Sequence, residues 1–211
     1  MGSEMCIRDR TLDLTKVADL GADYSAYGIK ANNKTTIVVD SNKTNPGKNG
    51  TITIKAKTLW SPSGDSGSKY TAAHGIAVGN FSQRFNKKVS EDLVKTTINA
   101  DVVIEELRGG SIKTTGISSM DCSDLAINGR FTIKPGAISL MQWNRGDQSK
   151  TYGIYMIGSN NTISITSADI DDSKNGSLSD LIKTNESLWG GKTEKNVLRI
   201  GCLLYTSPSP R

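Results

Sequence analysis

The sequence predicts an all-β chain folded as a right-handed parallel β-helix, a solenoid whose coils stack on one another, with a β-sandwich as the alternative. Apolar residues come in short β-branched runs and not at helical spacing. Polar stretches rich in Asn, Gly, Ser and Asp separate these runs. A Gly-Ile motif also recurs at wide intervals, which is typical of repeat architectures.

The two ends of the chain look like translations of opposite strands of one DNA adapter. A back-translation of Met5–Asp9, read on the complementary strand in a shifted frame, gives the sequence at 202–207. We therefore assign residues 1–10 and 202–211 to adapter and expect 11–201 to be an internal fragment of a longer protein. Removing three arginines and two acidic residues with the ends lowers the net charge from +5 to +4.

Five segments are predicted as strands because they are β-branched and often alternate with period two. They are residues 35–39, 51–54, 102–104, 130–133 and 162–166. Turns are predicted between them, at residues 41–50, 61–68 and 171–177. The only helical patterns, at 12–20 and 177–182, are too short to change the all-β prediction.

The recurring motif gives the strongest fold signal. Its copies are Tyr27-Gly28-Ile29, His74-Gly75-Ile76 and Tyr152-Gly153-Ile154, and an Asn-Asn turn with a β-branched strand follows the first and last. The glycines lie 47 and 78 residues apart (75 − 28 and 153 − 75), near two and three multiples of a coil of about 20–30 residues. We expect them at one corner of the stack, where only glycine accepts the backbone angle or the close approach of neighbouring strands.

These features together resemble the passenger regions of Gram-negative autotransporters and related secreted β-helix adhesins. The resemblance covers residues 24–167 and rests on the Tyr-Gly-Ile copies, the Thr51-Ile52-Thr53-Ile54 strand, the Asn-Asn turns, the Gly79-Asn80 ending and the scarcity of cysteine. It implies export, display at the cell surface and binding to host or neighbouring surfaces. The family's export signal and membrane anchor would lie outside this stretch.

Composition argues against several function classes. The lysines are interleaved with acidic residues and form no basic stripe, so nucleic-acid binding is not expected. Once the adapter residues are removed, Cys122 is the one cysteine, which gives neither a disulfide framework nor a zinc site. His74, the single histidine, sits where two other copies of the motif have tyrosine. We expect a corner side chain there and not a general base.

Three further patterns have structural explanations that we prefer. Residues 190–193 resemble the end of a phosphate-binding loop, but Glu186 occupies the place of the required first glycine. Asp169, Asp171 and Asp172 could serve a polysaccharide lyase or glycosidase if Asp169 and Asp171 converge with another carboxylate or an arginine such as Arg145, yet their segment reads as a turn. Trp60, Trp143 and Trp189 could stack on sugars, but anchoring of loops is the commoner role. The seven Asn-x-Ser/Thr triplets are attributed to composition.

The sequence therefore predicts a non-enzymatic surface-exposed or secreted solenoid with no catalytic, cofactor-binding or metal-binding residues. Its expected partners are glycans or proteins of host or neighbouring cells, with no nucleic acid and no membrane insertion by this stretch. A carbohydrate-active β-helix and a phage or pilus component are the alternatives. Because a stack exposes strand edges at both ends, the fragment is also expected to be prone to stacking and aggregation.

Overall fold

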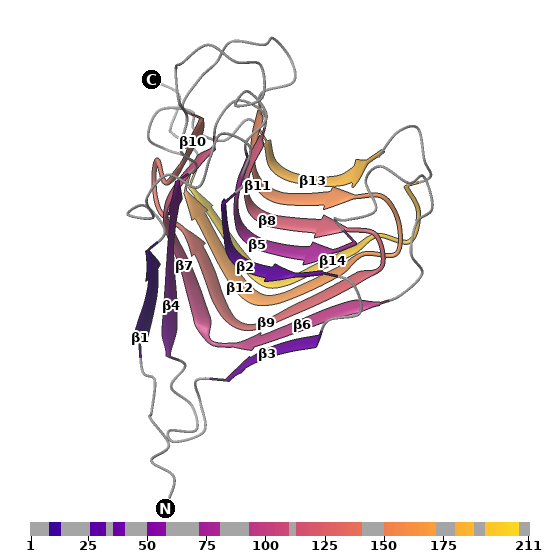
Figure 1. The fold of residues 1–211 in the computed structure, drawn as a ribbon, viewed down its shortest axis with the longest axis horizontal. Coiled ribbons are helices and arrows are strands. Elements are labelled where there is room, and N and C mark those ends of the chain that lie inside the picture. Colours follow the sequence, from indigo (N-terminus) through magenta and orange to yellow (C-terminus); the bar gives the residue numbers. More distant parts are fainter. Residues whose placement is uncertain are drawn as a thin grey trace, which may run out of the picture.

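The computed structural model describes residues 9–13, 26–32, 36–40, 50–57, 72–80, 93–109, 113–140, 150–171, 180–187 and 193–206. Within these ranges every regular element is a β-strand and every strand pairing is parallel (Figure 1). The all-β prediction is confirmed. The parallel pairing also differs from the antiparallel sheets that define a β-sandwich.

The strands form two sheets, and the chain alternates between them. Sheet B has the order β13-β11-β8-β5-β2, and sheet A has the path β1-β4-β7-β9-β12-β14 with β10, β3 and β6 attached. Sheet B comprises β2 (Ala26–Ala31), β5 (Ala73–Gly79), β8 (Lys113–Met120), β11 (Lys150–Ile157) and β13 (Asp180–Glu186). Sheet A comprises β1 (Asp9–Asp13), β3 (Thr36–Asp40), β4 (Thr51–Lys57), β6 (Val94–Asn99), β7 (Asp101–Gly109), β9 (Ser123–Ile133), β10 (Ile138–Leu140), β12 (Thr162–Asp171) and β14 (Val197–Thr206).

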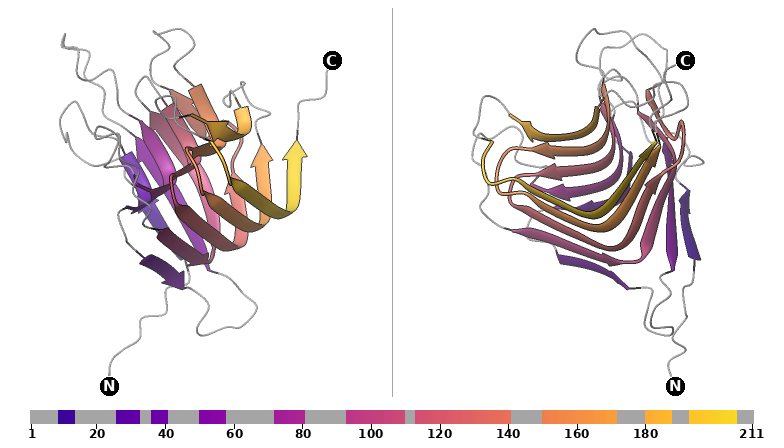
Figure 2. Two further views of the ribbon diagram at one scale, coloured as in Figure 1. Left: turned by 90° about the vertical axis from the view of Figure 1, so that its right-hand side faces the viewer. Right: turned by 180° about the vertical axis from the view of Figure 1, so that it is seen from behind.

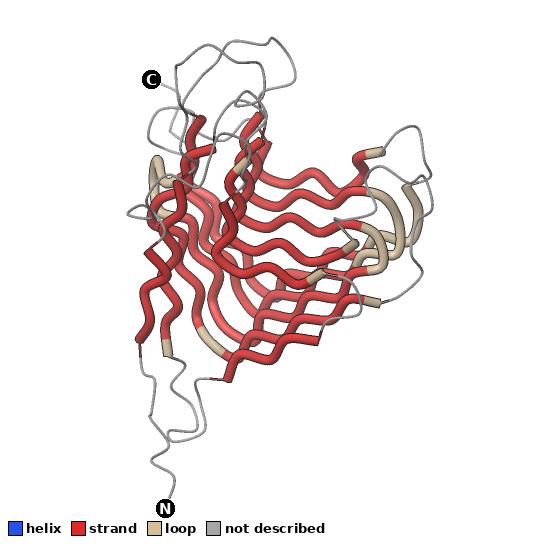
Figure 3. Tube along the Cα trace, viewed as in Figure 1, coloured by secondary structure: helices blue, strands red, loops and turns tan. Residues whose placement is uncertain are grey.

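Each return of the chain to the same sheet places a strand beside the previous one, and we call one such passage a circuit. The long strand β9 shows how sheet A turns a corner, because its first half pairs with β6 and its second half pairs with β7. Figure 2 shows the strands of successive circuits side by side in chain order, and Figure 3 shows the loops that join them. The arrangement is compatible with a β-solenoid.

One row of isoleucines crosses sheet B and defines the length of each circuit. Its members, in order of their pairing, are Ile29, Ile76, Ile117, Ile154 and Ile182. The first interval is 76 − 29 = 47 residues, and the next three are 41, 37 and 28. The predicted coil of about 20–30 residues was therefore too short for all but the last interval.

The recurring glycines do form one column, as the sequence predicted, but with a different spacing. Gly28 and Gly75 lie one circuit apart, not two, and Gly75 and Gly153 lie two apart, not three. Gly116 fills the place between them. A Cβ atom at Gly28, Gly75 or Gly116 would lie 2.6 Å from the carbonyl oxygen of the next glycine in the column. The close approach of neighbouring strands therefore requires glycine here.

Glycine and the isoleucine after it both face the interior, which turns the strand at this point. A Cβ at Gly75 would meet Ile104 Cδ1 at 2.6 Å, and Ile76 belongs to the hydrophobic core. Two successive inward residues shift the alternation by one place, as in a β-bulge. Figure 1 shows the bend in β5, β8 and β11.

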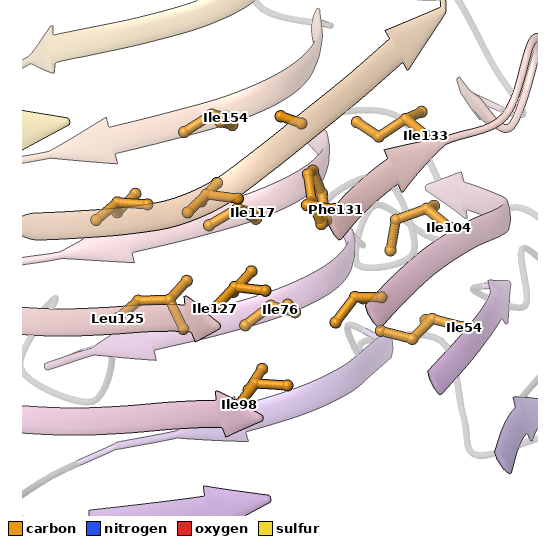
Figure 4. Packing of buried hydrophobic residues seen from close by; sticks show 14 of the residues in the cluster. Ile54, Ile76, Ile98, Ile104, Ile117, Leu125, Ile127, Phe131, Ile133 and Ile154 are labelled. Atoms are coloured by element: carbon orange, nitrogen blue, oxygen red, sulfur yellow. The ribbon is translucent and has the colours of Figure 1, made fainter. Parts of the chain in front are cut away.

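The core lies between the two sheets and consists of stacked rows of apolar side chains (Figure 4). In sheet A one row runs through Ile54, Ile104, Ile133 and Ile170, all nearly or fully buried. Burying each such side chain contributes about 1.5–3 kcal/mol. The alternation of these residues with exterior ones explains why the sheet A strands could be recognised from the sequence.

All five predicted strands are confirmed, and all five belong to sheet A. The strands of sheet B were missed, because their glycines and small polar residues give no period-two pattern. In sheet A, β1, β6 and β10 were missed as well. The helix predicted at 177–182 is wrong for its last three residues, which begin β13. The helix predicted at 12–20 is wrong for its first two residues, which lie in β1; its remainder is outside the described residues.

The expected adapter boundaries cross two strands of the structure. Asp9 and Arg10 lie in β1, where they pair with β4. Residues 202–206 lie in β14, where they pair with the second half of β12. No helix within the described ranges is long and apolar enough to span a membrane.

Candidate functional site

His74 lies on the exterior of sheet B in a column of side chains that runs along the stack. Pairing brings it level with Tyr27 on β2, Thr115 on β8 and Tyr152 on β11, so its equivalence to the two tyrosines is confirmed. Its ring stacks on Tyr27 with centroids 5.2 Å apart, and its Nδ1 is 2.7 Å from Thr115 Oγ1. Lys30 Nζ lies over the Tyr27 ring, 4.2 Å from its centroid.

A second apolar cluster lies on the exterior of sheet B, and sequence reasoning missed it. Its members are Met120, Tyr152, Tyr155 and Ile157, none more than 4% exposed. Tyr155 stacks on Tyr152 with centroids 4.4 Å apart, and Lys113 Nζ donates a 2.7 Å hydrogen bond to its hydroxyl. Sheet B is therefore buried on both faces around β8 and β11. The nearly continuous apolar run of β11 is the sequence signal that could have shown this.

Buried polar side chains form a second column, where the strands of sheet B give way to those of sheet A. We call it the polar turn column; its members are the buried Asn80, Asp121, Ser123 and Asn161 and the partly buried Asn196. Asn161 Nδ2 donates to the carbonyl of Ile157 at 2.8 Å, and its Oδ1 accepts from Ser123 Oγ at 2.8 Å. Asn161 also bonds Asn196 in the next circuit at 3.0 Å. The predicted Asn-Asn turn at residues 160 and 161 is thus part of a network that links circuits.

Asp121 is the buried carboxyl group of this column. Its side chain accepts a 2.9 Å hydrogen bond from the backbone N–H of Ser159, and it packs against Gly158, where a Cβ would lie 1.9 Å from its Oδ1. Burial raises the pKa of Asp121, and the Ser159 hydrogen bond opposes that rise. Asp121 and Cys122 both have positive φ angles, 39° and 53°, as the tight turn requires.

Cys122 does not meet His74. The cysteine follows the end of β8, whereas Thr115, which contacts His74, lies near the start of that strand. Cys122 is buried and its Sγ is 3.9 Å from Asn160 Nδ2. A buried thiol in such surroundings has the features of a structural cysteine and not those of an activated nucleophile.

Asp169 lies in β12 on the exterior of sheet A, between the buried residues Ala168 and Ile170. Ile170 and Asp171 also belong to β12 and pair with β14, so the turn predicted for them is wrong: pairing with a neighbouring strand outweighed turn composition. Asp169 forms no ion pair with any residue of the described ranges. Asp172 and Arg145, the other members of the considered site, lie outside those ranges, as do Trp60, Trp143, Trp189 and residues 190–192.

Three charged side chains on the exterior of sheet A form a triad: Lys55 of β4, Glu105 of β7 and Lys134, which directly follows β9. Lys55 Nζ lies 2.9 Å from Glu105 Oε2, and Lys134 Nζ contacts the other oxygen of Glu105. A register shift beside Lys55 leaves Glu105 as the extra residue on β7, which turns it outward. Hydrogen bonds from Lys134 and then Lys55 lower the pKa of Glu105.

Comparison with known proteins gives no relative: no family model, no curated protein and no solved structure matches the chain. Within the described part of the chain, no group of three or more His, Cys, Asp or Glu residues could hold a metal ion. Within the described residues, we take the exterior rows of the two sheets as the candidate surfaces.

Proposed function

We propose that the chain is a right-handed parallel β-helix and that it serves as a non-enzymatic, surface-exposed or secreted segment of the autotransporter-passenger or adhesin kind. The observation that carries this proposal is the in-register stacking of parallel strands through successive circuits. Such a stack presents long rows of exterior side chains, spaced by about 4.8 Å from strand to strand. Rows of this kind suit contact with an extended polar surface.

The handedness follows from the connections between parallel strands. Each circuit leaves one sheet, crosses to the other and returns to a parallel neighbour of the strand that it left. Connections between parallel strands are right-handed in about 98% of cases, because strand twist favours that path. A right-handed coil is therefore the expected sense of winding.

Charge pairing on the exterior favours binding over catalysis. Lys55 and Lys134 both pair with the carboxylate of Glu105, and Arg108 pairs with Glu106 at 3.2 Å. A general acid and base need carboxyl groups held apart with a substrate between them. Paired charges on an exposed sheet instead suit hydrogen bonds to glycans or proteins of host or neighbouring cells.

Adhesion of the 211-residue chain tests the proposal. Beads coated with the folded chain are passed over bacterial and animal cell surfaces and over glycan arrays, with beads carrying the heat-unfolded chain as the control. Retention that requires the folded chain is expected. Release of reducing or unsaturated ends from a polysaccharide would replace the proposal with the enzyme alternative. Failure to bind any surface, together with a stable trimer in solution, would favour the phage or pilus alternative.

A further inference from the structure

Among the described residues, the two end strands of sheet B, β2 and β13, each pair with a strand on one side only. A second copy of the chain could in principle add its β2 to the β13 edge and continue the stack. Exposed strand edges are a known route to such association, and proteins oppose it with bulky or charged residues at the edge. Two features of β2 and β13 oppose the addition of a second copy.

The first feature is the residue that ends the glycine column. A Cβ at Gly153 would lie 2.6 Å from the carbonyl oxygen of Leu181, the same distance that recurs at the three glycines before it. Leu181 therefore occupies the fifth place in the column, and its side chain is partly buried against the core. A strand added to β13 with the same geometry would bring a carbonyl oxygen to 2.6 Å from the Cβ of Leu181, closer than real Cβ atoms come to any neighbour.

The second feature is a pair of lysines at one register position. Pairing places Lys30 of β2 level with Ala77, Ser118, Tyr155 and finally Lys183 of β13. The inner strands carry uncharged residues at this position, and both end strands carry lysine. Addition of the β2 edge of a second copy to β13 would set Lys30 directly opposite Lys183. Like charges directly opposite one another destabilise strand pairing, although Lys183 Nζ also lies 2.8 Å from Glu186 Oε2 on its own strand, which weakens the repulsion.

We propose that the β13 edge is built to exclude a second copy of this chain, through the Cβ of Leu181 and the opposition of Lys183 to Lys30. Head-to-tail stacking of a second copy would lay a strand on each sheet, so obstruction at sheet B alone disfavours it. The sequence predicted that both ends of the stack would associate freely, whereas this proposal predicts that head-to-tail stacking is disfavoured. The proposed solenoid function does not depend on it.

Leu181→Gly and Leu181→Ala form the matched pair that tests this. Both variants lose the buried side chain, but only glycine removes the Cβ atom. Sedimentation velocity and small-angle X-ray scattering of the 211-residue chain should show monomers for the wild type and for Leu181→Ala. Leu181→Gly should form rods that lengthen with concentration, with an association constant at least about tenfold higher. Circular dichroism checks that the variants remain folded.

The lysine pair is tested in the Leu181→Gly background. Adding Lys30→Glu creates an opposite-charge contact with Lys183, so rod formation should strengthen and should weaken again as salt is added. Adding Lys30→Arg keeps the repulsion, so association should stay weak and should rise with salt. Rods formed by the wild-type chain, or equal association of the alanine and glycine variants, would overturn the proposal. Sedimentation of the wild-type chain tests the proposal even where a variant fails to fold, because wild-type rods would overturn it.

Discussion

Single glycine residues set how closely successive circuits approach one another. At Gly116 a Cβ would lie 2.6 Å from the carbonyl oxygen of Gly153 and 2.8 Å from Ile133 Cδ1. Because one of these atoms belongs to the backbone of the next circuit, relief would require the two strands to move apart. The glycine column is thus a packing requirement along the whole of sheet B.

Gly116→Ala is therefore expected to lower the free energy of unfolding by about 1–3 kcal/mol, the usual cost of overpacking. Urea denaturation followed by circular dichroism measures the loss. Ser164→Ala, on the exterior of sheet A, is the control and should change stability by no more than about 0.5 kcal/mol. Equal stability of Gly116→Ala and the wild type would contradict the close approach.

Asn161 links one circuit to the next through the polar turn column. Its fully buried side chain bonds Ser123, Asn196 and the carbonyl of Ile157. Asn161→Ala leaves these three partners without their hydrogen bonds to residue 161. We therefore expect the free energy of unfolding to fall by about 1–3 kcal/mol. Thermal or urea unfolding measures it, with the exposed Asn185→Ala as the control. Identical losses in both variants would show that the network does not stabilise the stack.

Asp121 should make the protein less stable as the pH rises from acid to neutral. Burial raises its pKa above the ordinary value of 3.8, so the folded chain holds the proton more tightly than the unfolded chain. Its contribution is fully present below 3.8 and is lost as the pH rises through the higher, folded value. The difference in unfolding free energy between the wild type and Asp121→Asn, measured across this range, should fall with pH.

Glu105 provides the internal control, because its shift has the opposite sign. Its two lysine partners hold its pKa below 4.5, so its contribution is present above that value and is lost as the pH falls through the folded value. The difference between the wild type and Glu105→Gln should therefore rise with pH. A flat or rising profile for Asp121→Asn would contradict the buried state of Asp121.

At the scale of elements, the strands of sheet B differ from those of sheet A in what covers them. Sheet A strands bury one face and expose the other, as the burial of β4 illustrates residue by residue. In β8 and β11 every residue after the first is buried. Tyr155, on the exterior side of β11, is 1% exposed.

Tyr155→Ala tests this two-sided burial. Truncating a fully buried aromatic side chain should cost about 3–5 kcal/mol. Tyr27→Ala, at the half-buried end of the same sheet, should cost clearly less. Both values come from chemical denaturation under one set of conditions. Equal and small losses would mean that the exterior of sheet B is open to solvent.

These differences between the sheets explain which elements the sequence could predict. β-branched residues at alternate positions mark the strands of sheet A, because one face is buried and the other is polar. In sheet B the glycine shifts the alternation, and burial of both faces removes it. Gly116 was missed for a related reason: Thr115 stands where the other copies have Tyr or His, although its pairing is the same.

At the scale of the whole molecule, circuit length was the feature that the sequence could not give. The intervals between successive members of the isoleucine row shrink from 47 to 28 residues, so the circuits are unequal. A period search expects equal repeats.

Of the considered catalytic set, Asp169 is placed on the exterior of sheet A, while the side chains that would complete it are not in the described ranges.

The stacking of parallel circuits is the central claim, and an experimentally determined structure of the chain tests it most directly. The glycine column is the feature to inspect. The account predicts that Gly28, Gly75, Gly116 and Gly153 lie on adjacent parallel strands in this order, with Leu181 next to Gly153 on the edge strand. Glycines on separate sheets, or on antiparallel neighbours, would contradict it and would remove the basis of the proposed function.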